Sequence, residues 1–338
     1  MNVTGLTVDQ LPFAGRMVSC MILGMSLVIG APGNLLVIWT IMRHFRQRSH
    51  TVRLILHLAV ADLLVLITLP LWIYSLVHSW VFGEASCKAM VYIISVCMFS
   101  SIFFITLMSV ERFVAIQYPF LMLRLKTTTI MDRCLVVVWL LAFVLGVPAF
   151  LTQQVDETDG TQQCLFKEYS SVAIEIFCLC LETLGGFVGP FTILLICYCR
   201  VTMQLKGMCL RSKQKSMFLI SSVMIAFTLC WLPYHIINII DLVCILAEGT
   251  EGTDAGDRCV PEIAIFISGA LAFISSSVNP VLYAFFAKNF QGNLQESRLV
   301  RLFQEIATHT NKLRELVIQH QPDQGVTRSQ TEQMSDTV

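Results

Sequence analysis

Long apolar runs separated by short polar gaps occupy the chain between residues 17 and 287. Five of these runs contain no Asp, Glu, Lys or Arg: Met17–Met42, Ala89–Val110, Cys134–Val155, Ser216–Ile240 and Ile263–Ala287. Two more are each interrupted by one carboxylate, Leu54–Val77 by Asp62 and Ile176–Cys199 by Glu182. Each run is long enough to cross a bilayer as a helix, which takes ~20 residues. None alternates with the period of a barrel strand, so the pattern predicts an all-α, seven-transmembrane helix bundle.

The remaining segments complete the predicted organisation. We expect an extracellular N-terminus over 1–16, the transmembrane domain over 17–287, a short amphipathic eighth helix on the membrane surface over 288–307, and a disordered cytoplasmic tail over 308–338. The tail carries hydroxyl side chains at alternating positions, which we predict to be phosphorylated and to bind arrestin. These residues are Thr327, Ser329, Thr331, Ser335 and Thr337.

Composition is consistent with a membrane protein, and the distribution of charge predicts its orientation in the membrane. The chain is 55% hydrophobic and 14% charged, with a mean hydropathy of +0.70, which is unlike a soluble domain. Its net charge is zero, but alternate loops are basic and the opposite loops acidic. The positive-inside rule then predicts a multi-pass plasma-membrane protein with its N-terminus outside and its C-terminus inside. The sequon at Asn2 agrees, because glycosylation requires a lumenal N-terminus.

The 13 cysteines do not indicate a metal site, because no CxxC pair is accompanied by a His/Cys cluster. Four cysteines lie at or near the outer side, where the environment is oxidising. We predict a disulfide between Cys87 and Cys164, which would tie the third helix to the second outer loop. A second disulfide, between Cys244 and Cys259, would close the last outer loop.

Polar residues near the middle of several helices form a candidate site within the membrane. Asp62 is the charged member, and Asn34, Ser101, Ser276 and Asn279 fall at a similar depth. Such groups are costly in a membrane unless they are matched. The cluster could hold a small cation on Asp62, or it could join the helices through hydrogen bonds around a satisfied Asp62.

Two further features concern helix ends and kinks. Glu111 and Arg112 close the third apolar run at the predicted cytoplasmic end; alone, Arg112 would be interpreted as an interfacial side chain that extends to water. Pro190, Pro233 and Pro280 each remove a backbone hydrogen bond and allow a kink.

Taken together, these motifs resemble the rhodopsin-like G-protein-coupled receptors, over Met17 to roughly Leu302. Seven signatures occur in order, one in each helix: Gly33-Asn34, Leu58-Ala59-Val60-Ala61-Asp62, Glu111-Arg112-Phe113, Trp139, Pro190 with Tyr198, Cys230-Trp231-Leu232-Pro233 and Asn279-Pro280-Val281-Leu282-Tyr283. The resemblance implies a receptor that binds an extracellular agonist and activates a G protein. It also implies an allosteric sodium ion at Asp62, Ser101 and Asn279, near Asn34.

The resemblance assigns an activation switch to residues on several helices. These are Glu111, Arg112, Ile102, Pro190, Tyr198, Phe227, Trp231, Pro233, Pro280 and Tyr283. Two positions depart from the usual pattern: Phe113 follows the motif arginine, and Lys213 stands where many relatives carry a carboxylate. An inactive-state ion pair of Arg112 would therefore have to be formed with Glu111.

Among these receptors, the runs Trp231 to Asn238 and Ala272 to Ala284 look most like those of leukotriene B4 receptors. We therefore expect a lipid agonist, with ligand contacts at Trp72, Ser95, Phe99, Glu182, Tyr234, His235, Asn238 and Phe266. The residues give independent support, since Tyr234, His235 and Asn238 share one face of the sixth helix with Trp231. His235 could instead be a satisfied interhelical histidine, and Glu182 could be purely structural. For Glu182 we expect neutral partners, His235 or Tyr234, because the outer halves of the third, sixth and seventh helices lack Lys and Arg.

The resemblance further implies a G protein of the inhibitory class and a role in chemotaxis. Val91, Phe99 and Ile265 are apolar where that subfamily is expected to be polar, so a chemoattractant peptide is an alternative agonist. A transporter is the alternative from another class, but it predicts internal repeats or paired broken helices, and the sequence shows neither. No hydrolytic or redox constellation is present, so we expect neither an enzyme nor an organic cofactor.

Overall fold

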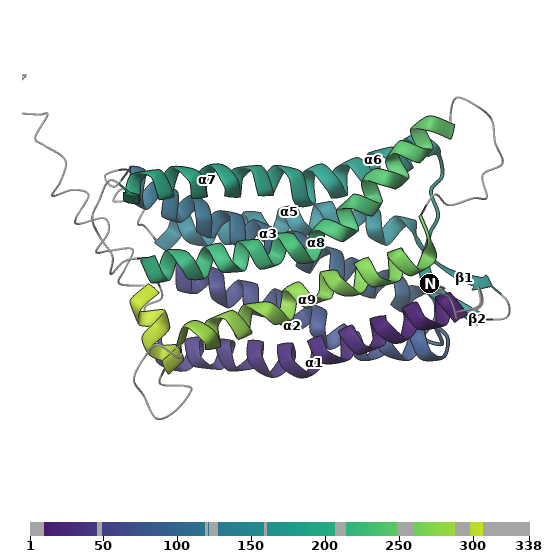
Figure 1. Cartoon of the computed structure of the whole chain (residues 1–338), viewed down its shortest axis with the longest axis horizontal. Helices are drawn as coiled ribbons and strands as arrows, with labels where there is room; N and C mark the ends of the chain where they lie inside the picture. The colour runs from purple at the N-terminus through teal and green to yellow at the C-terminus, as the bar shows by residue number, and fades with distance from the viewer. Residues whose placement is uncertain are drawn as a thin grey trace, which may run out of the picture.

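Seven helical spans run side by side in the computed structural model of the chain (Figure 1). It describes residues 10–45, 49–118, 121, 128–158, 161–206, 214–248, 260–287 and 298–306. The spans are built from α1 (Gln10–His44), α2 (His50–Val77), α3 (Glu84–Gln117), α5 (Thr128–Thr152), α6 (Val172–Cys180) with η1 (Leu181–Val188) and α7 (Gly189–Lys206), α8 (Gln214–Glu248) and α9 (Glu262–Ala287). All seven are long and apolar enough to cross a membrane, so the predicted seven-helix bundle is confirmed.

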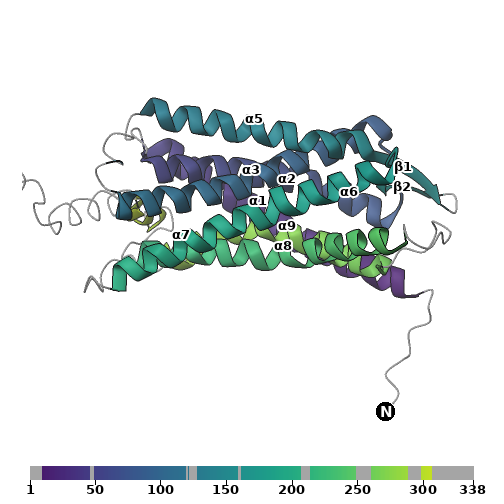
Figure 2. The same cartoon turned by 90° about the horizontal axis from the view of Figure 1, so that it is seen from above.

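The third span lies at the centre of the packing. Helix α3 packs against α2, α5 and α7, whereas α1 packs against α2 and α9, and α9 also packs against α8. Figure 2 shows the same order from above, with α5 along one side and α8 along the other. Buried apolar side chains between the helices form the core, and many other apolar side chains face outward, as expected for a protein surrounded by lipid.

A β-hairpin covers one end of the bundle, which we call the hairpin end. Its strands β1 (Gln153–Thr158) and β2 (Thr161–Lys167) pair antiparallel and place Gln153 opposite Lys167. The hairpin is held to the helices by the predicted disulfide between Cys87 and Cys164, whose Cα atoms are 5.8 Å apart. A backbone hydrogen bond of 2.7 Å, donated by the Trp80 N–H to the Gln162 carbonyl, is a second attachment. The end of the bundle opposite the hairpin is called the Arg112 end.

Helices α1 and α9 approach closely where α9 contains Pro280. A proline has no N–H, so the carbonyl of Ser276, four residues earlier, loses its helical partner. The Asn34 side chain replaces that partner, donating to the Ser276 carbonyl at 2.9 Å and to the Gly30 carbonyl at 3.0 Å. The approach requires a glycine, because a Cβ at Gly33 would lie 2.7 Å from Pro280. The Gly33-Asn34 signature therefore compensates for the proline of the seventh span.

The fifth span changes helical pitch beside the cavity described below. Residues Leu181–Val188 form a π-helix, in which the Gly189 N–H bonds to the Leu184 carbonyl five residues earlier. Pro190, the next residue, cannot donate to the carbonyl four residues before it, which favours such a local rearrangement. The wider turn begins at Leu181 and Glu182 and sets the direction of their side chains.

Several predictions concern residues at the margins of the described chain. Cys244 is disulfide-bonded, and its expected partner Cys259 lies outside the described residues. Asn2 and the tail residues Thr327, Ser329, Thr331, Ser335 and Thr337 also lie outside the described residues. Of the expected amphipathic segment 288–307, residues 298–306 are described; they are helical. Their apolar face is buried together with the core residues of the bundle.

Candidate functional site

A cavity opens between α3, α5, the π-helix and α8 in the half of the bundle nearer the hairpin. It encloses about 570 Å³ of empty space, part of it open to the surroundings. Of the residues expected to contact a ligand, five line it: Ser95, Phe99, Glu182, Tyr234 and His235. Most other lining residues are apolar, among them Met98, Ile102, Leu145, Ala149 and Leu181. A mostly apolar cavity with a few polar groups is typical of a small-molecule site.

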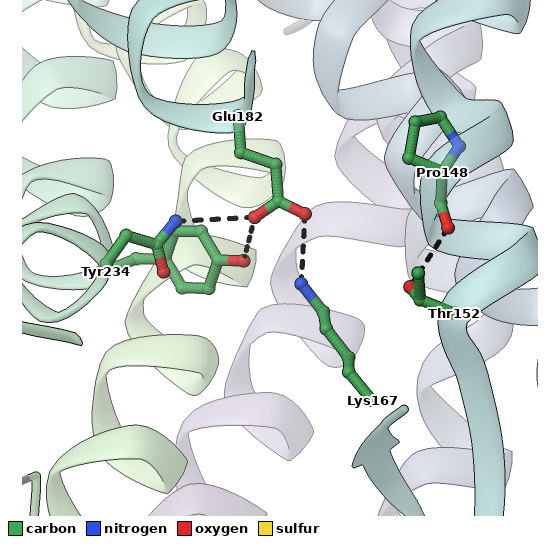
Figure 3. A network of polar contacts seen from close by, with 6 residues as sticks. Pro148, Thr152, Lys167, Glu182 and Tyr234 are labelled. Atoms are coloured by element: carbon green, nitrogen blue, oxygen red, sulfur yellow. Dashed lines mark hydrogen bonds and ion pairs between the residues drawn. The ribbon is translucent and has the colours of Figure 1, made fainter. Parts of the chain in front are cut away.

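The polar wall of the cavity is centred on the Glu182 carboxylate (Figure 3). Lys167 Nζ lies 2.9 Å from Glu182 Oε1. The Tyr234 hydroxyl donates to Oε2 at 2.9 Å, and Asn238 Nδ2 donates to the same oxygen at 3.3 Å. In Figure 3 the carboxylate lies between Tyr234 and Lys167, so a single side chain joins the fifth span, the sixth span and the hairpin. We call these four residues the Glu182 cluster.

The expectation that Glu182 has only neutral partners was wrong. Tyr234 is a partner as expected, but Lys167 forms an ion pair with it, and no hydrogen bond between Glu182 and His235 is present among the described residues. The outer halves of the helices named above supply no cation, whereas Lys167 is the last residue of β2. A signal was available in the sequence, because Lys167 is only three residues from Cys164, and the disulfide of Cys164 fixes β2 above the bundle.

The charge of Lys167 is stabilised by its surroundings. Burial alone would lower the pKa of this ammonium group, but the adjacent Glu182 carboxylate raises the pKa well above the ordinary lysine value. Nearby, burial raises the pKa of Tyr169 to about 12. Lys167 is therefore cationic and Tyr169 neutral at physiological pH, and the side chain of Lys167 remains 28% exposed.

Aromatic rings form the floor of the cavity. Trp231 stacks on Phe227 with ring centroids 5.7 Å apart. His235 stacks on Phe187 at 4.6 Å. His235 is 4% exposed, and its Nδ1 has no hydrogen-bond partner among the described residues. A buried polar atom beside a cavity is costly unless it is paired, so this nitrogen is available to a ligand.

The other three expected ligand contacts are not among the described lining residues. Asn238 acts through Glu182 rather than as a lining residue. Trp72 packs nearer the hairpin end, against Trp80 at 5.6 Å, and belongs to the apolar cluster around the disulfide. Phe266 belongs to α9, but its side chain lies outside the described residues.

The intramembrane polar residues also come together. Asp62 is 2% exposed; its Oδ2 accepts from Asn279 Nδ2 at 2.7 Å and its Oδ1 from the Ser101 hydroxyl at 3.4 Å. Asn34 is not part of this group, because its amide is directed to the Ser276 and Gly30 carbonyls. The carboxylate has no cationic partner in the part of the chain that the structure describes.

Thr51 separates Glu111 from Arg112 at the other end of the bundle. Its hydroxyl donates to Glu111 Oε2 at 2.8 Å, and Arg112 Nη2 donates to the same hydroxyl at 3.4 Å. In this conformation no ion pair between Glu111 and Arg112 is present among the described residues, and the Thr51 hydroxyl bridges the two side chains. Arg112 also donates to the carbonyl of Ile306 at 3.3 Å.

The expected switch residues are distributed along the bundle between these sites. Ile102 and Phe227 line the cavity, and Trp231 donates to the Ser275 hydroxyl at 3.2 Å. Pro190 is buried next to the π-helix, and Pro233 and Pro280 lie inside α8 and α9. Tyr283 is 2% exposed, whereas Tyr198 is 41% exposed on the outside of α7. In this conformation the two tyrosines therefore have different environments.

Comparison with known proteins gives one consistent result. Residues 33–283 match the family model described as 7 transmembrane receptor (rhodopsin family). The chain is 34% identical to human leukotriene B4 receptor 1 over 79% of its length and 76% of that receptor. It is 36% identical to human leukotriene B4 receptor 2, covering 82% and 78% of the two chains. Mouse C-C chemokine receptor type 8 is 32% identical, covering 83% and 78%.

Proposed function

Since the chain belongs to the rhodopsin family of seven-transmembrane receptors, we propose that it is a receptor for an oxidised fatty acid of the leukotriene B4 type. The family and the receptors that the chain is similar to indicate a G-protein-coupled receptor with an extracellular agonist. These relatives are receptors and not enzymes. We further propose that it signals through a G protein of the inhibitory class and acts in chemotaxis.

The Glu182 cluster is the observation that supports this ligand class. The cavity has mostly apolar walls, which suit a hydrocarbon chain. Glu182 lines the cavity and offers a carboxylate acceptor, and the ammonium group of Lys167 lies 2.9 Å from it, behind the lining residues. A hydroxyl can donate to Glu182, and the carboxylate of a fatty acid can pair with Lys167, whose ammonium group has further protons to donate. The unpartnered Nδ1 of His235 can bind a second polar group.

The same geometry explains how binding could reach the Arg112 end. An agonist in the cavity contacts the Trp231 and Phe227 stack directly. Trp231 is two residues from Pro233, where α8 lacks a backbone hydrogen bond and can bend. An agonist that binds the bent form more tightly shifts the population toward it; a shift from 1:99 to 99:1 requires about 5.5 kcal/mol of preference. We place the hairpin end outside the cell and the Arg112 end inside, following the charge of the loops.

Sodium at Asp62 is a further part of the proposal. Hard cations bind oxygen ligands, and the carboxylate of Asp62 together with the Ser101 hydroxyl provides them in a buried position. The residues therefore fit the ion, with Asp62, Ser101 and Asn279 as its surroundings. A cation would compensate a carboxylate that has no cationic partner among the described residues.

The likeness to C-C chemokine receptor type 8 supports a second candidate, a chemoattractant peptide agonist. Nucleotide exchange on purified G proteins separates the two. Leukotriene B4, other hydroxylated fatty acids and a set of chemoattractant peptides would be applied to membranes containing the receptor. We expect a hydroxylated fatty acid to stimulate exchange on the inhibitory class. Stimulation by peptides alone would contradict the lipid proposal, and uptake of labelled fatty acid without exchange would indicate a transporter.

A further inference from the structure

The described segment 298–306 is an amphipathic helix whose apolar face is buried in the protein. Leu299, Leu302, Phe303 and Ile306 are 2%, 5%, 0% and 1% exposed, and they follow the i, i+3, i+4, i+7 spacing of one helix face. Arg301 and Gln304, on the opposite face, are exposed. A helix lying on a membrane surface would instead present its apolar face to lipid.

The buried face packs into the Arg112 end of the bundle. The Phe303 ring contacts Phe45, just after α1, at 6.3 Å between centroids. It also contacts Tyr283 of α9 at 5.8 Å. In Figures 1 and 2 the segment, coloured yellow, lies within the outline of the bundle at the end opposite the hairpin. Two views at right angles therefore place it across this end rather than beside the helices.

Arg112 contacts this segment directly. Its Nη2 donates to the carbonyl of Ile306 at 3.3 Å. A backbone carbonyl oxygen accepts hydrogen bonds, and a bond to a charged guanidinium group is stronger than one between neutral groups. Arg112 is only 2% exposed, and its Nε and Nη1 have no hydrogen-bond partner among the described residues. The segment thus provides an acceptor for an arginine that Glu111 does not pair with.

We infer that residues 298–306 form an intramolecular plug, which caps Arg112 and must leave before a G protein can bind at this end. The inference rests on the proposed function, because it assigns the Arg112 end to the G protein. Phe303 gives the plug a link to activation, since any movement of Tyr283 in α9 changes the surface on which the ring rests. The plug therefore suppresses signalling in the absence of agonist.

Two substitutions one residue apart test the plug in the full chain. Phe303→Glu places a charge on the buried face, whereas Gln304→Glu places the same charge on the exposed face. Agonist-independent nucleotide exchange should rise on the order of ten-fold for Phe303→Glu, because loss of a buried ring shifts the population away from the closed form. Gln304→Glu should stay within about two-fold of the wild type, as expected for a surface change. Equal basal exchange in the two variants overturns the inference.

Amide hydrogen exchange provides a second test that uses the wild-type receptor. The amides of 298–306 should be protected in the receptor alone and lose that protection in a complex with nucleotide-free G protein. Protection that persists in the complex overturns the plug. The two proposals fail separately: a wild type that responds to hydroxylated fatty acids while both variants behave alike contradicts only the plug. High basal exchange in Phe303→Glu, with no response of the wild type to those lipids, supports the plug and contradicts only the ligand class.

Discussion

Replacing Glu182 by Gln keeps the shape of the side chain but removes the charge that holds the polar wall of the cavity together. The carboxylate interacts with Lys167 and Tyr234 at 2.9 Å each and with Asn238 at 3.3 Å. A glutamine has one carbonyl oxygen to accept from these donors, and it cannot form the ion pair. Lys167 would then lose the ion pair that fixes its position. A ligand hydroxyl would lose its charged acceptor.

The size of the effect follows from the strength of such bonds. A hydrogen bond to a charged group contributes about 1.5–3 kcal/mol, and about 1.4 kcal/mol corresponds to ten-fold in affinity. The side chains of Lys167 and Glu182 are 28% and 21% exposed, so the lower end of the range applies. Agonist potency should therefore fall roughly ten-fold or more in Glu182→Gln, and at least as much in Glu182→Ala.

The assay is agonist-stimulated nucleotide exchange in membranes with matched surface expression, using the most potent hydroxylated fatty acid. Glu175→Gln is the matched control, because Glu175 is a second carboxylate on the same span, two turns nearer the hairpin end, and does not line the cavity. An analogue without the hydroxyl completes a double-mutant cycle. The analogue should lose little further potency on Glu182→Gln. Losses that simply add would refute direct contact and leave Glu182 a role in helix packing.

Three further predictions follow from other parts of the chain. Sodium should lower agonist affinity in the wild type, and Asp62→Asn should abolish this effect in radioligand binding; sodium sensitivity that survives the substitution places the ion elsewhere. Replacing Cys87 or Cys164 by Ser should reduce surface expression or agonist binding, measured by flow cytometry and radioligand binding, because a native disulfide contributes about 2–5 kcal/mol in small domains. The double variant should be no worse than either single variant, and clear additivity argues against a shared bond. Truncation before Gln321 should leave G-protein activation intact but slow agonist-driven internalisation, since it removes the predicted phosphorylation sites; internalisation at the wild-type rate would show that arrestin does not need them.

The sequence predicts the bundle well because its signals are local. An uncharged run of sufficient length can only be a helix in a membrane, and the polar residues Asp62, Ser101 and Asn279 are found at one depth by position alone. The contact of Glu182 with Tyr234 was predictable for the same reason, because both residues lie at a similar depth in neighbouring spans. The cavity residues contributed by these helices could therefore be identified in advance.

What could not be predicted depends on how distant segments fold back on the bundle. Lys167 reaches Glu182 because a hairpin and a disulfide carry β2 over the helices, and no periodicity indicates that path. Thr51 comes between Glu111 and Arg112 through packing of α2 on α3. The apolar face of 298–306 fits either a membrane surface or a protein groove, and only its contacts with Phe45 and Tyr283 decide between them.

The most direct measurement of the central claim is nucleotide exchange on an inhibitory G protein, driven by leukotriene B4 and other hydroxylated fatty acids in wild-type and Glu182→Gln receptors side by side. We expect that at least one of these lipids stimulates exchange through the wild type and that roughly ten-fold more of it is required on Glu182→Gln. A receptor that responds to chemoattractant peptides only, or to the same lipid equally in both forms, would contradict it.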